Sequence, residues 1–93
     1  MTVNEAFTVL RLDGKTEDYQ VVNGLLAAVP AYIENATGMP ESYQAAYPVV
    51  DTCTGFLLRL WYYPEGADTD KLQRVVDSLL KSITLIARTL TTE

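Results

Sequence analysis

The C-terminal segment carries the longest regular apolar pattern in the sequence. Its apolar residues recur at alternating steps of four and three, at Leu72, Val76, Leu79, Ile83, Ile86 and Leu90. That spacing gathers them on one face of an α-helix but would scatter them over both faces of a strand. We therefore predict a helix from Asp68 or Thr69 to about Leu90, roughly 30 Å long at 1.5 Å per residue. Such a helix needs other elements to cover its apolar face, which favours a helical bundle.

The N-terminal segment has the signals of a short capped helix. Thr2 and Glu5 have the spacing of a capping box, in which the Thr2 hydroxyl accepts from the Glu5 amide and the Glu5 carboxylate accepts from the Thr2 amide. The apolar spacing that follows predicts a helix from about Val3 to Leu10. The pair Asp13-Gly14 is typical of a turn beyond its end.

A second helix is predicted to run from near Thr16 to the glycine at position 38. Thr16 is a suitable N-cap, and Gly38 is the residue type that most readily takes the left-handed conformation past a helix end. Pro30 falls inside this segment and removes one backbone donor, so we expect either a kink or two shorter helices. The apolar residues keep the helical spacing across it, at Val22, Leu25, Leu26, Val29 and Ile33.

A third long helix should begin at Pro48, since proline is favoured at the first helical position. Its apolar residues cover a broad face, which predicts a central element contacted on several sides; they are Val49, Val50, Cys53, Phe56, Leu57, Leu60 and Trp61. The turn signal of residues 64–66 should end it. Residues 41–47, with proline on both sides, stay open between a further short helix and a loop.

Together these segments predict an all-α protein, a small bundle of four to five helices with a long C-terminal helix from about Thr69 to Leu90, in a single domain over residues 1–93. A domain of 93 residues buries roughly 60% of the surface of its unfolded chain, so self-association would add needed stability. The composition, 48% hydrophobic and 20% charged, is too apolar for a disordered chain. No apolar run approaches the roughly 18 residues of a membrane span, and no secretory signal pattern opens the chain, so we expect a cytosolic protein without a membrane partner.

The residues that usually carry catalysis or bind metals are scarce. The chain has no histidine and one cysteine, which excludes an intrachain disulfide, a thiolate cluster and a His-ligated metal site. That cysteine, Cys53, falls on the apolar face of the third helix, where we expect an inert core residue. Gly14-Lys15-Thr16 resembles the end of a phosphate-binding loop, but Val9 stands where that motif requires its first glycine. We therefore predict no enzymatic activity, no cofactor, no bound metal and no small-molecule substrate.

Trp61, Tyr62 and Tyr63 form an aromatic cluster at the end of the third helix. Such a cluster most often closes the end of a small core, yet three consecutive side chains point in different directions and cannot all face one core. Trp and Tyr are also the residues that anchor protein interfaces. The cluster is therefore either part of the core or a candidate interface for a subunit or partner.

The last helix carries a second candidate interface, which is positively charged. The chain has a net charge of −5, but Arg74, Lys81 and Arg88 recur every seven residues and fall on the side opposite the apolar seam. Leu85, which widens the apolar stripe, is a further candidate interface residue. The basic row is either an ordinary solvated face or a contact for DNA phosphates or for the carboxylates of a neighbour.

Several short motifs follow one another in an order typical of a known family. They are Leu10-Arg11-Leu12-Asp13, Ala27-Ala28, Tyr32-Ile33-Glu34, Thr37-Gly38, Leu60-Trp61-Tyr62 and Val76-Asp77-Ser78-Leu79-Leu80. With this order the chain resembles the small head-tail connector proteins, also called adaptor or DNA-packaging proteins, of long-tailed phages and prophages. It departs from the family pattern at Pro30, at Tyr63-Pro64 and in the greater length of the last helix.

The resemblance implies a structural protein of the virion that is assembled in the host cytoplasm. Proteins of this family are small helical bundles that multimerise into a ring between the portal and the tail and line the DNA channel. The implied partners are further copies of the chain, the phage portal and tail-side connector proteins. Double-stranded DNA would pass through without specific binding, and a net negative charge suits passage better than tight binding.

The residues also leave a function of another class open. A small protein-binding or regulatory module would dock through its C-terminal helix in the groove of a partner. A helix-turn-helix DNA-binding protein is disfavoured, because phosphate contacts reward a basic surface and this chain is acidic.

Overall fold

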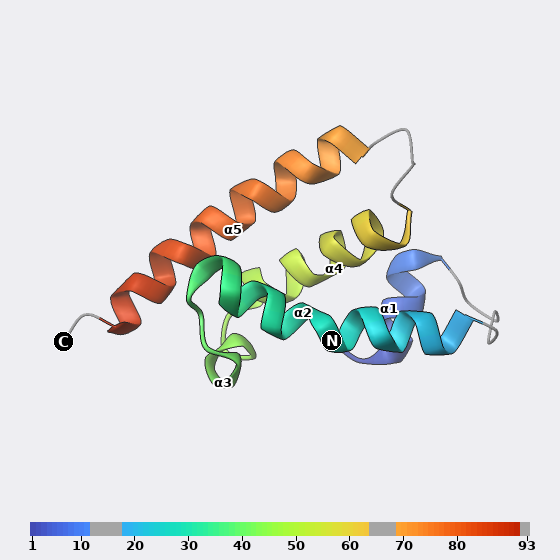
Figure 1. Ribbon diagram of the computed structural model, residues 1–93, viewed down its shortest axis with the longest axis horizontal. Helices are drawn as coiled ribbons and strands as arrows, with labels where there is room; N and C mark the ends of the chain where they lie inside the picture. The colour runs from blue at the N-terminus through green and yellow to red at the C-terminus, as the bar shows by residue number, and fades with distance from the viewer. Residues whose placement is uncertain (12–17, 64–68, 92–93) are drawn as a thin grey trace.

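A central helix, α4 (Pro48–Tyr62), organises the fold, and the other long helices lie against it (Figure 1). The computed structural model describes residues 1–11, 18–63 and 69–91. The described residues form five helices and no strand, namely α1 (Val3–Leu10), α2 (Tyr19–Thr37), α3 (Glu41–Gln44), α4 and α5 (Thr69–Thr91). The predicted all-α fold with a long C-terminal helix is confirmed.

The central place of α4 follows from the breadth of its apolar surface. α1, α2 and α5 each pack against this helix. Val50, Cys53, Leu57 and Leu58 are at most 5% exposed, and four further apolar residues of the helix are half-buried around them, namely Val49, Phe56, Leu60 and Trp61. The predicted start at Pro48 and the predicted central element are both confirmed.

The N-terminal helix α1 has the capping box that its sequence predicts. The Glu5 amide donates to Thr2 Oγ1 at 3.2 Å, and the Thr2 amide donates to Glu5 Oε1 at 2.9 Å. The hydrogen bond from the Thr2 backbone holds the pKa of the Glu5 carboxyl below its ordinary value. The helix ends at Leu10 as predicted, and Arg11 closes it in the left-handed conformation with φ of 58°. The predicted Asp13-Gly14 turn lies outside the described residues.

α2 runs through Pro30 as one helix rather than two. Its N-cap is Asp18, whose side chain makes no capping hydrogen bond to the helix, and the predicted cap at Thr16 lies outside the described residues. The predicted C-terminus is confirmed, because Gly38 has φ of 84° and its amide donates to the Glu34 carbonyl at 2.8 Å. Buried side chains on both sides of the proline hold the helix together, since Val22, Val29 and Ile33 are all packed in the core.

α5 lies across α4 and α2 with its apolar seam turned inward. In Figure 1 it forms the upper edge of the molecule and runs antiparallel to α4. Val76, Ile83 and Ala87 are buried, so the seam predicted from the spacing is the packed face. The principal extents of the molecule, 47 × 27 × 18 Å, make it flat and elongated, and α5 exposes its opposite face along the long axis.

Two glycines at α2 should respond in opposite directions to replacement by alanine. Gly24 lies exposed inside the helix, and a Cβ there would have no heavy atom within 4 Å. Gly24→Ala should therefore raise the free energy of unfolding by about 0.5–1 kcal/mol, because the unfolded chain loses conformational freedom. Gly38→Ala should lower it by about 1–2 kcal/mol, because the left-handed conformation is strained for alanine. Urea unfolding of both variants measures the two shifts, and shifts of the same sign would contradict the helix geometry.

Candidate functional site

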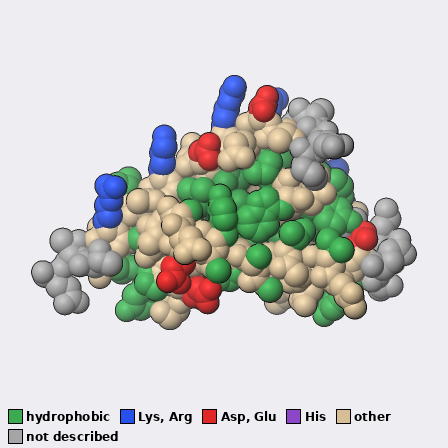
Figure 2. Space-filling view, viewed as in Figure 1, with side chains coloured by type: hydrophobic (Ala, Val, Ile, Leu, Met, Phe, Trp, Pro, Cys, Tyr) green, Lys and Arg blue, Asp and Glu red, His purple; other side chains and the backbone are tan. Residues whose placement is uncertain are grey.

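The side of α5 that faces away from the core carries positive charge. Arg74, Lys81 and Arg88 are exposed there, one for every two helical turns. Their spacing sets them opposite the buried Val76 and Ile83. Figure 2 shows Lys and Arg side chains projecting along the upper edge of the molecule, over α5, with acidic side chains among them, and a further acidic group at the lower left, near α3. The basic side chains on this view therefore lie mostly over α5, whereas acidic side chains lie both there and near α3.

The basic row is interrupted in its first half. Asp77 lies one turn after Arg74 and one turn before Lys81, so its carboxylate reduces the positive charge of that stretch. Gln73 Nε2 donates a hydrogen bond to Asp77 Oδ1 at 3.0 Å. The part of the row without an acidic residue therefore lies after Asp77 and contains Lys81 and Arg88.

The second half of the row surrounds an exposed leucine. Leu85 is 60% exposed and lies one turn from both Lys81 and Arg88. On its other side, the residues one turn away are the small and exposed Ser82 and Thr89, which leave the leucine side chain standing clear. We call Lys81, Leu85 and Arg88 the Leu85 knob. An apolar side chain between two cations suits contact with an apolar surface that has carboxylates at its rim.

The first residue of the aromatic cluster joins α4 to α2 at the surface. The ring centroids of Trp61 and Tyr32 are 5.2 Å apart and the ring planes meet at 89°, an edge-to-face contact. Trp61 is half-buried, and Tyr32 keeps 39% of its surface exposed. In Figure 2 hydrophobic side chains gather in the band between α5 and α2. Trp61 therefore contributes to the packing of the fold and keeps a partly exposed edge.

The other two aromatic residues bind the ends of neighbouring helices. The Tyr62 hydroxyl donates to Asp18 Oδ2 at 2.5 Å, and the Tyr63 hydroxyl donates to the carbonyl oxygen of Leu10 at 2.9 Å. Their rings meet edge to face, with centroids 4.8 Å apart. Asp18 precedes α2 and Leu10 ends α1, so the two hydroxyls fix both helices to the end of α4. The Tyr63 hydroxyl also provides a hydrogen-bond donor for the Leu10 carbonyl, which has no partner within α1 because it lies at the end of that helix.

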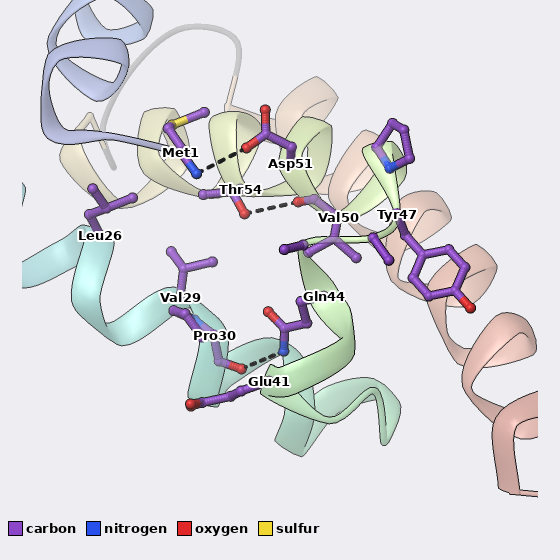
Figure 3. Close-up of a pocket in the computed structure, with 13 residues that line it drawn as sticks. Met1, Leu26, Val29, Pro30, Glu41, Gln44, Tyr47, Val50, Asp51 and Thr54 are labelled. Carbon is purple, nitrogen blue, oxygen red and sulfur yellow. Dashed lines mark hydrogen bonds and ion pairs between the residues drawn. The ribbon is translucent and has the colours of Figure 1, made fainter.

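A pocket lies between α2, α3 and the first turns of α4 (Figure 3). Its volume is about 610 Å³, and its apolar wall includes Leu26 and Val29 of α2 and Val50 of α4. Two exposed carboxylates, those of Glu41 and Asp51, belong to its lining. The pocket is thus an apolar hollow with negative charge at its rim.

A buried glutamine in the pocket lining joins α3 to α2. Gln44 is only 7% exposed, and its Nε2 donates to the carbonyl oxygens of Pro30 at 3.0 Å and Met39 at 3.2 Å. Figure 3 shows this carboxamide reaching across to α2 along one side of the hollow. Residues 41–47, for which the sequence left a short helix and a loop open, form a single helical turn followed by a loop, and both line the pocket. The prolines that bracket it were the only local signal of this arrangement.

One carboxylate at the rim has a partner within the chain. The Met1 ammonium nitrogen lies 3.3 Å from Asp51 Oδ1, and the Asp51 side chain stays 57% exposed. The Met1 side chain is 6% exposed although the whole residue is 36% exposed, because the ammonium and backbone face water. Exposed pairs of this kind contribute only about 0–1 kcal/mol, so Asp51 can accept a competing cation at little cost.

The cysteine predicted to be inert lies in the core. Cys53 is 0% exposed, and burial raises the pKa of its thiol to about 11. Over the residues that the structure describes, no group of three or more His, Cys, Asp or Glu side chains is placed to hold a metal ion. Within the same ranges, no helix is long and apolar enough to cross a membrane.

Comparisons of the chain with protein-family models, with curated proteins and with solved structures find no match. What this surface can bind therefore follows from the arrangement of its side chains. That geometry offers three features on the described residues: the Leu85 knob on α5, the partly exposed Trp61 edge and the acid-rimmed pocket beside α3.

The tyrosine hydroxyls at the end of α4 should contribute measurably to stability. Tyr63→Phe removes a hydrogen bond to a backbone carbonyl and should lower the free energy of unfolding by about 1 kcal/mol. Tyr62→Phe should cost more, about 1.5–3 kcal/mol, because its acceptor is a carboxylate. Tyr43→Phe, on the exposed surface of α3, is the matched control and should change stability by less than about 0.5 kcal/mol. If all three variants unfold at the same urea concentration, the hydroxyls do not hold the helix ends.

Cys53 should resist alkylation in the folded protein. The thiolate is the reactive species, and both its burial and its raised pKa keep it scarce and inaccessible at about pH 8. Iodoacetamide should label the native protein only as fast as the core opens, and the urea-unfolded protein much faster. Intact-protein mass spectrometry follows both rates. Rapid labelling without denaturant would contradict the burial of this residue.

Proposed function

We propose that this chain is a structural assembly protein, a head-tail connector subunit of a long-tailed phage or prophage. In this role, copies of the chain form the ring that joins the portal to the tail and surrounds the DNA channel. The observation that carries the proposal is the outward face of α5, which exposes Leu85 between cations in an otherwise acidic chain. A face of that kind supports contact between copies of the chain, as in a ring.

The resemblance supplies the particular kind of assembly. The ordered motifs fall at structural positions in this fold, since Leu10 ends α1, Gly38 caps α2 and Trp61 contacts α2 from the end of α4. Motifs at helix ends and at a helix contact can specify an arrangement of helices, and this supports the resemblance as one of fold. The net charge of −5 further supports a channel through which DNA slides, because an acidic lining repels the phosphates instead of binding them.

The proposal predicts closed rings of the full chain. Negative-stain microscopy and native mass spectrometry at increasing protein concentration should find a ring of one fixed subunit number, because a small domain gains stability by burying surface against copies of itself. Preassembled portal rings of the same phage or prophage should bind the chain. A protein that stays monomeric at every concentration and also fails to bind those portals would refute the proposal.

A protein-binding or regulatory module is the second candidate, and the exposure of Leu85 favours it as well. Docking would have to use the outward face of α5, because Val76 and Ile83 of the apolar seam are already buried inside the chain. Deleting residues 81–93 would remove the core residues Ile83 and Ala87 together with that face. Leu85→Asp tests the face alone: loss of binding to a different protein, with self-association unchanged, would favour the module over the connector.

A further inference from the structure

The outward face of α5 and the pocket beside α3 have complementary chemistry. We propose that the Leu85 knob of one copy docks in the acid-rimmed pocket of a second copy. This inference rests on the proposed ring assembly and names the two surfaces that would build it. The occupant of the pocket is then the chain itself, with the leucine side chain inside the hollow and the flanking cations at the rim.

Charge complementarity supports this pairing. Lys81 and Arg88 lie one turn before and one turn after Leu85. The pocket lining includes the exposed carboxylates of Glu41 and Asp51, and the Met1 ammonium that pairs with Asp51 at 3.3 Å would share that carboxylate with an incoming cation. A third carboxylate stands beside the rim, because Glu34 Oε1 accepts the amide of Glu41 at 3.2 Å. Opposite charges around an apolar centre favour contact between the knob of one copy and the pocket of another. They disfavour contact between the pockets of two copies, because both rims carry carboxylates.

The shapes also agree. Leu85 is 60% exposed on a helix whose adjacent positions, Ser82 and Thr89, are small, so the side chain can enter a hollow without obstruction. The pocket, with about 610 Å³ and walls from Leu26 and Val29, has room for the leucine and for part of the helix that carries it. Burying an exposed leucine against such walls removes apolar surface from water.

The placement of the two surfaces determines what kind of assembly they form. In Figure 1 α5 slopes from the upper right to the lower left of the molecule, and α3, which lines the pocket, lies at the bottom. A contact between two different surfaces of the same chain is head-to-tail, so each added copy presents a free surface to the next. Repetition gives a ring when the rotation closes, which matches the proposed connector.

Single substitutions on each surface test the pairing. Leu85→Asp should weaken self-association of the full chain at least about tenfold, measured by analytical ultracentrifugation, because it places a carboxylate against an acidic apolar hollow. Ala46→Trp should have a similar effect, since Ala46 is exposed and lines the pocket, which the indole would fill. Val21→Asp is the matched control: Val21 is 55% exposed on α2 outside both surfaces, and this change should leave association within about twofold. Circular dichroism melts must show that each variant is folded.

Mixing the two defective chains gives the sharper test. The Leu85→Asp chain keeps an intact pocket, and the Ala46→Trp chain keeps an intact knob, so each should be monomeric alone while the mixture forms a one-to-one heterodimer in native mass spectrometry. A charge exchange is the independent check on the rim. Lys81→Glu and Glu41→Lys should each weaken association up to about fivefold, and the two changes in one chain should restore it.

The outcomes separate this inference from the proposed function. Rings that persist in both the Leu85→Asp and the Ala46→Trp chains, or a mixture that does not pair, would overturn the docking and leave the ring proposal intact. A wild-type chain that is monomeric at every concentration would overturn the docking as well, and portal binding alone would then decide the connector role. Heterodimers in the mixture together with rescue by charge exchange would establish the contact.

Discussion

The packing of α4 against three neighbours is the constraint on which the rest of this structure depends. Cys53, Leu57 and Leu58 are removed almost completely from water, and α1, α2 and α5 all pack against this helix, while α2 also contacts α1 and α5 directly. With so few residues in the domain, the shared core that these helices form around α4 has to supply most of the apolar burial. The same burial raises the pKa of the Cys53 thiol. It also explains why α5 has one face packed against the core and an opposite face that is exposed.

Hydrogen bonds then fix details that apolar burial leaves undefined. The tyrosine hydroxyls at the end of α4 join the ends of α1 and α2, and the Gln44 carboxamide joins α3 to the backbone at Pro30. These contacts are directional and specify how helix ends meet. The Gln44 contact also shapes the acid-rimmed pocket, since α3 forms one side of the hollow.

Charge separation connects the fold to the proposed assembly. The amphipathic pattern of α5 turns its cations outward, while Glu34 near the end of α2 and Glu41 at the start of α3 come together at the pocket, where the Glu41 amide donates to Glu34 Oε1. Two different and complementary surfaces on one chain allow copies of that chain to bind head to tail. The aromatic cluster, by contrast, is engaged in contacts within the fold: Trp61 and Tyr62 are half-buried, and Tyr63 is 44% exposed.

The sequence by itself determined the helices, because capping, proline position and apolar spacing act within a few residues. It predicted the capping box of α1, the left-handed Gly38, the start at Pro48 and the outward basic face of α5. It placed Leu85 at the margin of the apolar stripe, whereas in the structure this side chain is 60% exposed between Lys81 and Arg88. It did not predict that Tyr62 would reach Asp18, 44 positions away, or that Leu26, Glu41 and Asp51 would enclose one pocket. Only the tertiary structure decided these, because contacts between distant segments depend on how whole helices cross, and no local pattern encodes a crossing.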